Sequence, residues 1–219
     1  MKRTRLLFAL LAAVLAAAPL SSRAAPQEPK EGEPHKKETH DARWFIRNGA
    51  DSGAKQIPKA AKPTTIDVLG KLSVFFALAK EKRLAPVETT VYTVEGDLVR
   101  YDKHDDGDFQ FVLRDAKTGK TIVCELPDPY EVPKSPFLRE IAAARDTFSD
   151  TFSDTFKPEE ARTTLLPGKV HLRVSGIGYI GRKGGANGKD PMGTPNGVQL
   201  HPVTGVTVLG GAAGAKAGG

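Results

Sequence analysis

Apolar and polar residues alternate through the middle of the chain, which is the pattern of half-buried β-strands. Residues 89–101 read TTVYTVEGDLVRY, and Gly96 inside this stretch predicts a bulge or a sharp bend. Residues 108–113 (DFQFVL) and 121–126 (TIVCEL) alternate in the same way on either side of a turn that contains Gly119. The three stretches predict a meander of three strands.

After the meander, apolar residues recur at the spacing of a helix. Ser135 and Pro136 are typical of an N-cap with proline at the first helical position, and large apolar residues then recur at helical spacing as far as Phe152. A tandem repeat at 146–156, DTFSDTFSDTF, has a period of four residues and extends the end of this predicted helix. Its regularly spaced aspartates are interpreted as a solvated face.

Two more alternating stretches, at 170–179 and 198–208, complete the series, and Pro202 in the second predicts a strand edge or a bulge. The predicted order is therefore strand, strand, strand, helix, strand, strand. This order predicts a mainly β protein with one or two helices, built as an OB-like five-stranded Greek-key barrel (β-β-β-α-β-β) with an N-terminal extension. We assign the barrel to residues 86–209.

The first 24 residues have the pattern of a secretory signal peptide. Residues 1–5 (MKRTR) carry three positive charges, the next thirteen residues are apolar, and a run of small residues ends at Ala25. Thirteen apolar residues give about 20 Å of helix against a hydrocarbon core of roughly 30 Å, so a membrane anchor fits poorly. We expect cleavage after Ala24 and an exported protein, periplasmic or secreted, with no membrane span in the mature chain.

The segments around the barrel differ from it in composition. Residues 25–42 are rich in proline and charge and lack large apolar residues, which predicts a disordered linker. Residues 43–85 predict a partly helical N-terminal extension, in which Thr64 or Thr65 would cap a helical apolar pattern over residues 64–84. Gly70 lies within this pattern and argues against a single continuous helix. Residues 210–219 (GGAAGAKAGG) predict a disordered tail.

Removal of the signal peptide changes the charge of the protein. The whole chain carries +6 at pH 7, and its first 25 residues hold four basic residues and no acidic ones, so the exported part carries +2. Between Glu88 and Leu209 there are 15 basic and 18 acidic residues. OB domains bind nucleic acid through a positive groove with stacking aromatic side chains, so the barrel is not expected to bind nucleic acid tightly.

Several sequence motifs resemble known exported proteins. The stretch VYTVEGDLVRYDKHDDGDFQFVLRDAKTGKTIVCELPD is similar to the first three strands of the bacterial OB-fold (BOF) exported proteins. DGDFQFVLRD, CELPDP, SPFLREIAAAR, VSGIGY and PNGVQLHPV are similar to a family of exported bacterial proteins that read DGDYHLVL, AEIPDP and NGIELHPV at these places. The resemblance covers roughly residues 86–209 and part of the extension. It implies an OB-like fold and export, and it implies no particular activity.

The loop HDDGD offers three carboxylates, Asp105, Asp106 and Asp108, around a glycine. Calcium prefers such oxygen ligands, so this loop is the candidate metal site. An EF-hand is excluded, because its twelfth position needs a glutamate and falls on Leu113 or Ala116. A polar connection between two strands is the alternative interpretation of the loop. Beyond calcium at this loop, no cofactor is expected.

A glycine-rich loop at 181–197 joins the fourth and fifth predicted strands, where OB barrels usually frame their ligand. It fits no phosphate-loop spacing. The candidate ligand-binding residues lie on this loop and on the strands around it, and they are Tyr101, Arg173, Tyr179, Arg182, Lys183, Asn196 and His201.

These observations favour an exported, non-catalytic binding or interaction module whose ligand comes from the cell envelope or the extracellular medium. The alternative is a metal-dependent hydrolase of nuclease type that uses the acidic loop at 105–108. Staphylococcal-type nucleases share the OB barrel and a DGD turn, but they need an arginine followed by acidic residues on the next strand, which TIVCELPDP lacks. Cys124 alternates with Ile122 and Leu126, which predicts a buried, inert thiol.

Overall fold

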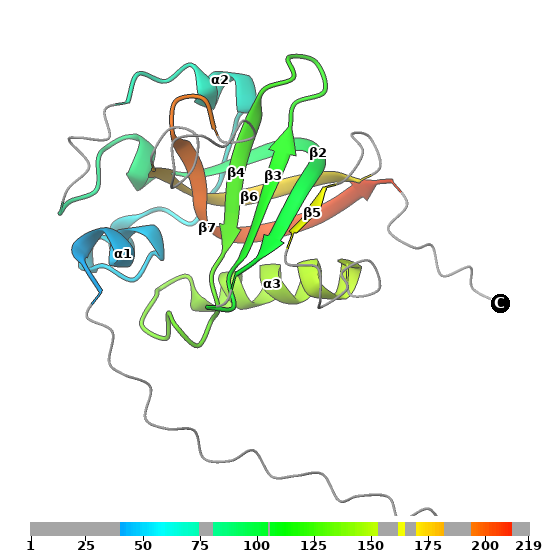
Figure 1. Cartoon of the computed structure of the whole chain (residues 1–219). Coiled ribbons are helices and arrows are strands. Elements are labelled where there is room, and N and C mark those ends of the chain that lie inside the picture. Colours follow the sequence, from blue (N-terminus) through cyan, green and yellow to red (C-terminus); the bar gives the residue numbers. More distant parts are fainter. Residues whose placement is uncertain are drawn as a thin grey trace, which may run out of the picture. The chain divides into compact units, whose positions relative to one another are not determined.

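The fold is a closed barrel of five strands (Figure 1). A computed structural model describes residues 40–74, 81–104, 106–152, 162–164, 170–181 and 194–211. The barrel strands are β2 (Val91–Lys103), β3 (Phe109–Arg114), β4 (Thr121–Leu126), β6 (His171–Ile180) and β7 (Val198–Gly210). Their order is β2-β3-β4-β7-β6, and β6 pairs with β2 to close the ring. Only β4 and β7 pair in parallel within this ring of described strands, which confirms the mainly β, OB-like fold.

The remaining elements are short, apart from one helix. They are α1 (Ala42–Arg47), α2 (Ile66–Gly70), α3 (Leu138–Phe152), β1 (Lys62–Pro63), β5 (Arg162–Thr164) and the 3-10 helices Ser52–Gln56 and Val87–Thr89. Both β1 and β5 pair with β2. Within the described residues, no helix is long and apolar enough to cross a bilayer. The predicted signal peptide, most of the linker and most of the tail lie outside the described residues.

The long strand β2 belongs to both sides of the barrel. It pairs with β6 through its first half and with β3 through its second, and it changes partner at Asp97. The register irregularity in β2 lies between Leu98 and Arg100, so the bulge is near Gly96 but not at it. Gly96 is needed for space, because a Cβ there would lie 2.9 Å from Cδ1 of Ile66.

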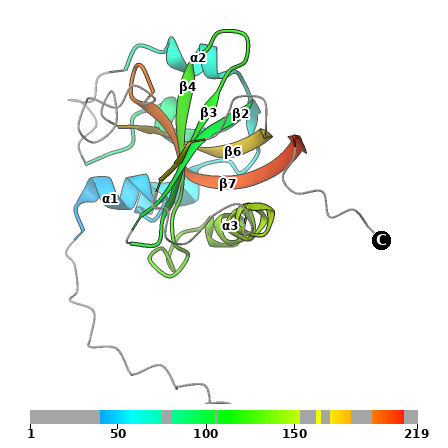
Figure 2. The same ribbon diagram turned by 45° about the vertical axis from the view of Figure 1, so that its right-hand side comes forward.

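The core contains the side chains that the alternation predicted to face inward. From β3 and β4 it takes Phe111, Leu113, Ile122, Cys124 and Leu126. Helix α3 adds Ala144, Phe148 and Phe152, and it lies along the barrel beside β7 (Figures 1 and 2). The Ser135 hydroxyl accepts a hydrogen bond from the backbone N–H of Phe137 at 3.2 Å, and the helix itself begins at Leu138, two residues after the predicted first position at Pro136.

The N-terminal extension packs on the barrel. Ile66 and Leu69 of α2 are buried in the main core, and Ile57 packs with Val91 and Ile177 in a second cluster. The described part of the extension therefore belongs to the barrel domain.

The helix predicted in the extension is much shorter than expected. Thr65 is its N-cap as predicted, since its hydroxyl accepts a hydrogen bond from Val68 N–H at 3.1 Å. The helix ends at Gly70, after five residues. Glycine is among the weakest helix formers, so the helical apolar pattern beyond it does not continue the helix. Residues 75–80 lie outside the described part of the chain.

Candidate functional site

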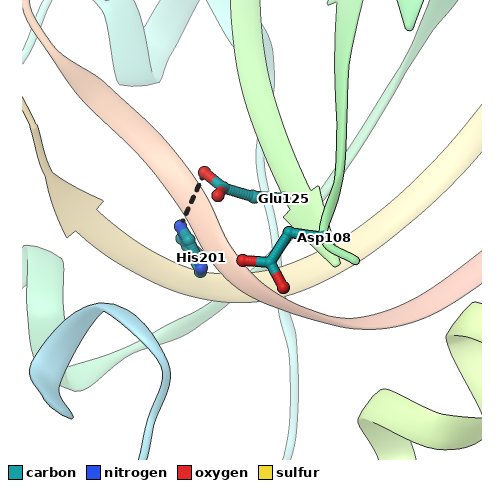
Figure 3. A group of neighbouring side chains, drawn as sticks. All are labelled: Asp108, Glu125 and His201. Carbon is teal, nitrogen blue, oxygen red and sulfur yellow. Dashed lines mark ion pairs between the residues drawn. The ribbon is translucent and has the colours of Figure 1, made fainter. Parts of the chain in front are cut away.

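Three ionisable side chains from separate strands converge on one point (Figure 3). Asp108 directly precedes β3, Glu125 is the penultimate residue of β4, and His201 lies in β7. Their ligand-type atoms all lie within 4.8 Å of one another. All three residues are buried, with exposed fractions of 4%, 6% and 0%. We call them the carboxylate–histidine cluster.

The turn before β3 places Asp108. Gly107 adopts a φ of +87°, which favours glycine, and its N–H donates to the His104 carbonyl at 3.0 Å. The carboxylate of the exposed Asp106 accepts a hydrogen bond from the Asp108 N–H at 3.1 Å. Oδ1 of Asp108 accepts one from the Asp128 N–H at 2.7 Å. The acidic loop therefore orients one of its aspartates into the barrel wall.

The alternation of β4 places Glu125. Its neighbours Cys124 and Leu126 point into the core, so Glu125 lies on the other face of the strand, in register with Gln110 of β3. A carboxylate at this position would ordinarily be solvated. Here the face is covered, and Glu125 is buried.

A bulge in β7 places His201. Between Leu200 and Val203, two residues of β7, His201 and Pro202, oppose the single residue Ile177 of β6. The bulge predicted from Pro202 is thus confirmed. Bulges redirect side chains at sheet edges and next to functional sites, and this one lies beside α1.

The end of α1 covers His201. Gly49 ends the helix with a φ of +61°, and a Cβ there would lie 3.1 Å from Cγ of Pro202. Asn48 Oδ1 is consequently 3.1 Å from His201 Nε2. Asn48 Nδ2 donates to the carbonyl of Trp44 at 3.1 Å, and this bond orients the amide so that its oxygen faces the imidazole.

His201 and Glu125 form a close but imperfect pair. His201 Nδ1 lies 3.0 Å from Glu125 Oε2, which is an ion-pair distance. The contact does not have hydrogen-bond geometry, and the buried Nδ1 has no hydrogen-bond partner. Burial lowers the pKa of His201, although the Glu125 carboxylate opposes this.

The two carboxylates have opposite pKa shifts. Burial raises the pKa of Asp108 to about 7, and the charge of Glu125 adds to this increase. Burial would also raise the pKa of Glu125, but His201, Arg47 and His104 hold it at about 2. The cluster therefore holds a carboxylate at Glu125 and a readily protonated carboxyl at Asp108.

This arrangement suits the binding of a cation. Two carboxylates and one imidazole nitrogen form a mixed oxygen and nitrogen donor set that divalent metals accept. Arg47 lies at the rim, with Nη2 4.0 Å from Asp108 Oδ2 and 31% of its side chain exposed. Its buried Nε has no hydrogen-bond partner.

Of the residues predicted to bind a ligand, Tyr179 and His201 come together. Their rings are 6.0 Å apart, and the guanidinium of Arg43 lies 4.5 Å from the centre of the Tyr179 ring. Tyr101 is elsewhere, buried in the core near Phe148.

The other predicted residues do not join the cluster. Arg173 pairs with Glu95 at 2.7 Å on the surface. Asn196 donates to the carbonyls of Leu69 and Leu72 at 2.8 and 2.9 Å, which fixes the end of α2. Asp105, Arg182 and Lys183 lie outside the described residues.

Sequence reasoning missed Glu125 as a site residue. The alternating pattern of residues 121–126 explains Glu125 as a strand residue, and its place after Cys124 in the motif CELPDP did not mark it as a ligand. Each cluster residue lies in a different one of the quoted motifs: Asp108 in DGDFQFVLRD, Glu125 in CELPDP and His201 in PNGVQLHPV. The predicted burial of the Cys124 thiol is confirmed, because the side chain is fully buried, and this burial raises its pKa. The sequence matches no protein-family model and no curated protein.

Proposed function

We propose that the protein is an exported, non-catalytic binding module with an OB-like barrel, and that the carboxylate–histidine cluster is its binding site. Export is inferred from the signal-peptide pattern of the first 24 residues. The ligand is a small polar species from the cell envelope or the surrounding medium, and nucleic acid is not expected to bind.

One observation carries this proposal: the cluster buries three ionisable side chains, and Nδ1 of His201 has no hydrogen-bond partner. Burying a charged or polar group without a partner costs free energy, and an apolar side chain at the same position would avoid that cost. A site that binds a ligand recovers the cost when the ligand arrives. The neighbouring Tyr179, at 8% exposure, and the rim residue Arg47 supply further contacts for such a ligand.

A metal-dependent hydrolase is the second candidate, and one observation favours it. Asp108 has a pKa of about 7, which suits a general base near neutral pH, and Arg47 lies 4.0 Å away. This version of the hydrolase uses Asp108 with Glu125 and His201, rather than the acidic loop alone.

Amide chemical-shift mapping by NMR tests the proposal. The probes are Zn²⁺, Mn²⁺, Ca²⁺, Mg²⁺, inorganic phosphate, acetate, putrescine and maltose. The expected result is that at least one probe shifts amides of residues 47–49, 106–108, 125–128 and 199–203. Shifts confined to other surfaces, or no shifts with any probe, would overturn it.

Turnover assays separate the two candidates. Chromogenic phosphodiester, carboxylic ester and glycoside substrates are tested with each metal, using Asp108→Asn as the control variant. The binding module predicts no turnover above that of the variant. Turnover that Asp108→Asn removes would replace the binding module with the hydrolase.

A further inference from the structure

We propose that the carboxylate–histidine cluster binds one divalent transition-metal ion, with Zn²⁺ as the reference ion, through His201 Nδ1 and one oxygen each of Asp108 and Glu125. This inference rests on the proposed function, because it names the class of ligand for the same site.

The first argument is convergence. Three donor atoms from three strands lie within 4.8 Å of one another, and all three residues are buried. Donor atoms bound tetrahedrally to one metal at about 2.0–2.2 Å lie about 3.3–3.6 Å apart, so the most distant pair needs an inward shift of up to about 1.5 Å. The side chains already point toward one another (Figure 3).

The second argument is the state of His201. Its Nε2 faces Asn48 Oδ1 at 3.1 Å, and the bond from Asn48 Nδ2 to the Trp44 carbonyl keeps that oxygen in place. Nε2 must therefore carry the hydrogen, which leaves the lone pair of the neutral ring on Nδ1. That lone pair is buried, lacks a hydrogen-bond partner and lies 3.0 Å from Glu125 Oε2. Two acceptors that face each other in this way need a proton or a metal ion between them.

The third argument is the set of contacts behind the donors. Histidines that bind metals usually donate their other N–H to a carbonyl or carboxylate, which fixes the ring, and Asn48 has that position here. Carboxylate ligands are likewise held by hydrogen bonds, and Asp108 Oδ1 accepts one from the Asp128 N–H at 2.7 Å. Its other oxygen faces Arg47 at 4.0 Å and is the one available to a metal.

The donor set selects the class of metal. Calcium and magnesium prefer all-oxygen sites, whereas an imidazole nitrogen with two carboxylates suits Zn²⁺, Mn²⁺ and Fe²⁺. This differs from the all-oxygen calcium site predicted for the acidic loop, since only Asp108 of that loop contributes. Three protein donors leave at least one coordination position for water or for a group of the partner molecule.

Equilibrium dialysis with elemental analysis tests the inference on the full chain without a histidine tag. Metal-free protein is titrated with ZnCl₂, MnCl₂, CaCl₂ and MgCl₂. The expected result is one Zn²⁺ per chain, with Ca²⁺ and Mg²⁺ bound at least ~100-fold more weakly.

Substitutions locate the ion. Asp108→Asn, Glu125→Gln and His201→Gln should each weaken Zn²⁺ binding by more than the roughly 100-fold that loss of an outer partner causes. The control is His171→Gln, which alters the partly exposed His171–Asp97 pair and should leave Zn²⁺ binding unchanged. Circular dichroism reports which variants are folded, and Asp108→Asn, which removes a buried charge, keeps the test valid if His201→Gln unfolds.

Three outcomes would overturn the metal site. They are no Zn²⁺ binding, unchanged binding in Asp108→Asn, and loss of binding in His171→Gln. If Zn²⁺ does not bind while phosphate, acetate, putrescine or maltose shifts the amides of the cluster, the metal inference fails and the proposed binding module stands. In that case a proton lies between His201 and Glu125.

Discussion

Two glutamates are buried in the described part of the chain, and their carboxylates have different surroundings. Glu88 is fully buried and accepts four hydrogen bonds, two from the Arg43 guanidinium and one each from the N–H groups of Leu84 and Ile180. Glu125 is almost as buried, but its closest described partner is His201 Nδ1, without hydrogen-bond geometry. The fold itself supplies hydrogen bonds to both oxygens of the Glu88 carboxylate, but its described residues do not do so for the Glu125 carboxylate.

This difference separates a structural charge from a functional one. A buried carboxylate whose oxygens are fully hydrogen-bonded connects parts of the fold, and Glu88 joins α1, through Arg43, to the end of β6. A second carboxylate, that of Asp108, lies beside Glu125 and adds to the free-energy cost of burying the Glu125 charge. Under the proposed function, a ligand from outside the chain completes this site.

The largest expected effect is on Glu88. Glu88→Gln leaves the Arg43 guanidinium without its counter-charge and turns an amide group toward backbone donors, which should cost about 3–5 kcal/mol of unfolding free energy. Urea denaturation measures this cost. The matched control is Glu95→Gln, which alters the exposed Glu95–Arg173 pair and should change stability by less than about 1 kcal/mol. Equal costs would show that Glu88 is not the structural charge we describe.

The next effect is a pH dependence that arises from Asp108. Its folded pKa of about 7 exceeds the ordinary value of 3.8, so the folded state binds more protons than the unfolded state between these values. Stability of the metal-free protein should therefore fall as pH rises from about 4 to about 7, by about 2–4 kcal/mol. Burial of Asp108 is the main cause of this pKa shift, the negative charges of Glu125 and Asp106 add to it, and Arg47 opposes it.

Thermal melts in EDTA across this pH range measure the effect. Asp108→Asn cannot ionise and should flatten the curve, so that the variant is more stable than the natural protein at pH 8. A variant that keeps the full slope would show that Asp108 is not the titrating group.

A smaller effect distinguishes the hydrogen bonds of two asparagines, Asn48 and Asn196. Asn48→Ala removes the acceptor that orients His201, and it should weaken Zn²⁺ binding about 10–100-fold. Asn196→Ala removes bonds to the end of α2, and it should lower stability by about 1–2 kcal/mol without changing Zn²⁺ affinity. Paired calorimetric titrations and melts test both. If both variants bind Zn²⁺ equally well, Asn48 does not orient the site.

The smallest effect is expected at the second His–carboxylate pair. His171 Nδ1 lies 2.9 Å from Asp97 Oδ1, with 38% of the histidine side chain exposed. His171→Gln should change the unfolding free energy by less than about 1 kcal/mol, because exposed pairs contribute little. A larger loss of unfolding free energy in urea melts would contradict the expected difference in stability between the His171–Asp97 pair and the more deeply buried His201–Glu125 pair.

Most of the barrel could be predicted from the sequence because local rules and tertiary packing agree there. Alternation of period two placed Phe111 and Leu113 inward, and Pro202 marked the bulge in β7. The length of α2 could not be predicted in the same way. The apolar residues after Gly70 keep a helical spacing, but the helix ends at this glycine and Leu72 packs against the core without continuing it.

The site was only partly predictable, because its residues come from three separate strands. Asp108 and His201 were singled out, each for a reason unrelated to the other. Glu125 was missed because a single acidic residue in an alternating strand is usually solvated. Glu125 is buried beside His201, which contacts the end of α1, and nothing in the pattern of the extension predicts where α1 packs.

Anomalous X-ray diffraction from crystals grown with Zn²⁺ tests the central claim most directly. Data collected on both sides of the zinc absorption edge locate the ion without reference to affinity or activity. The account predicts one strong peak within bonding distance, about 2.0–2.2 Å, of His201 Nδ1 and of carboxylate oxygens of Asp108 and Glu125. Peaks only at surface histidines such as His171, with the cluster empty, would contradict it.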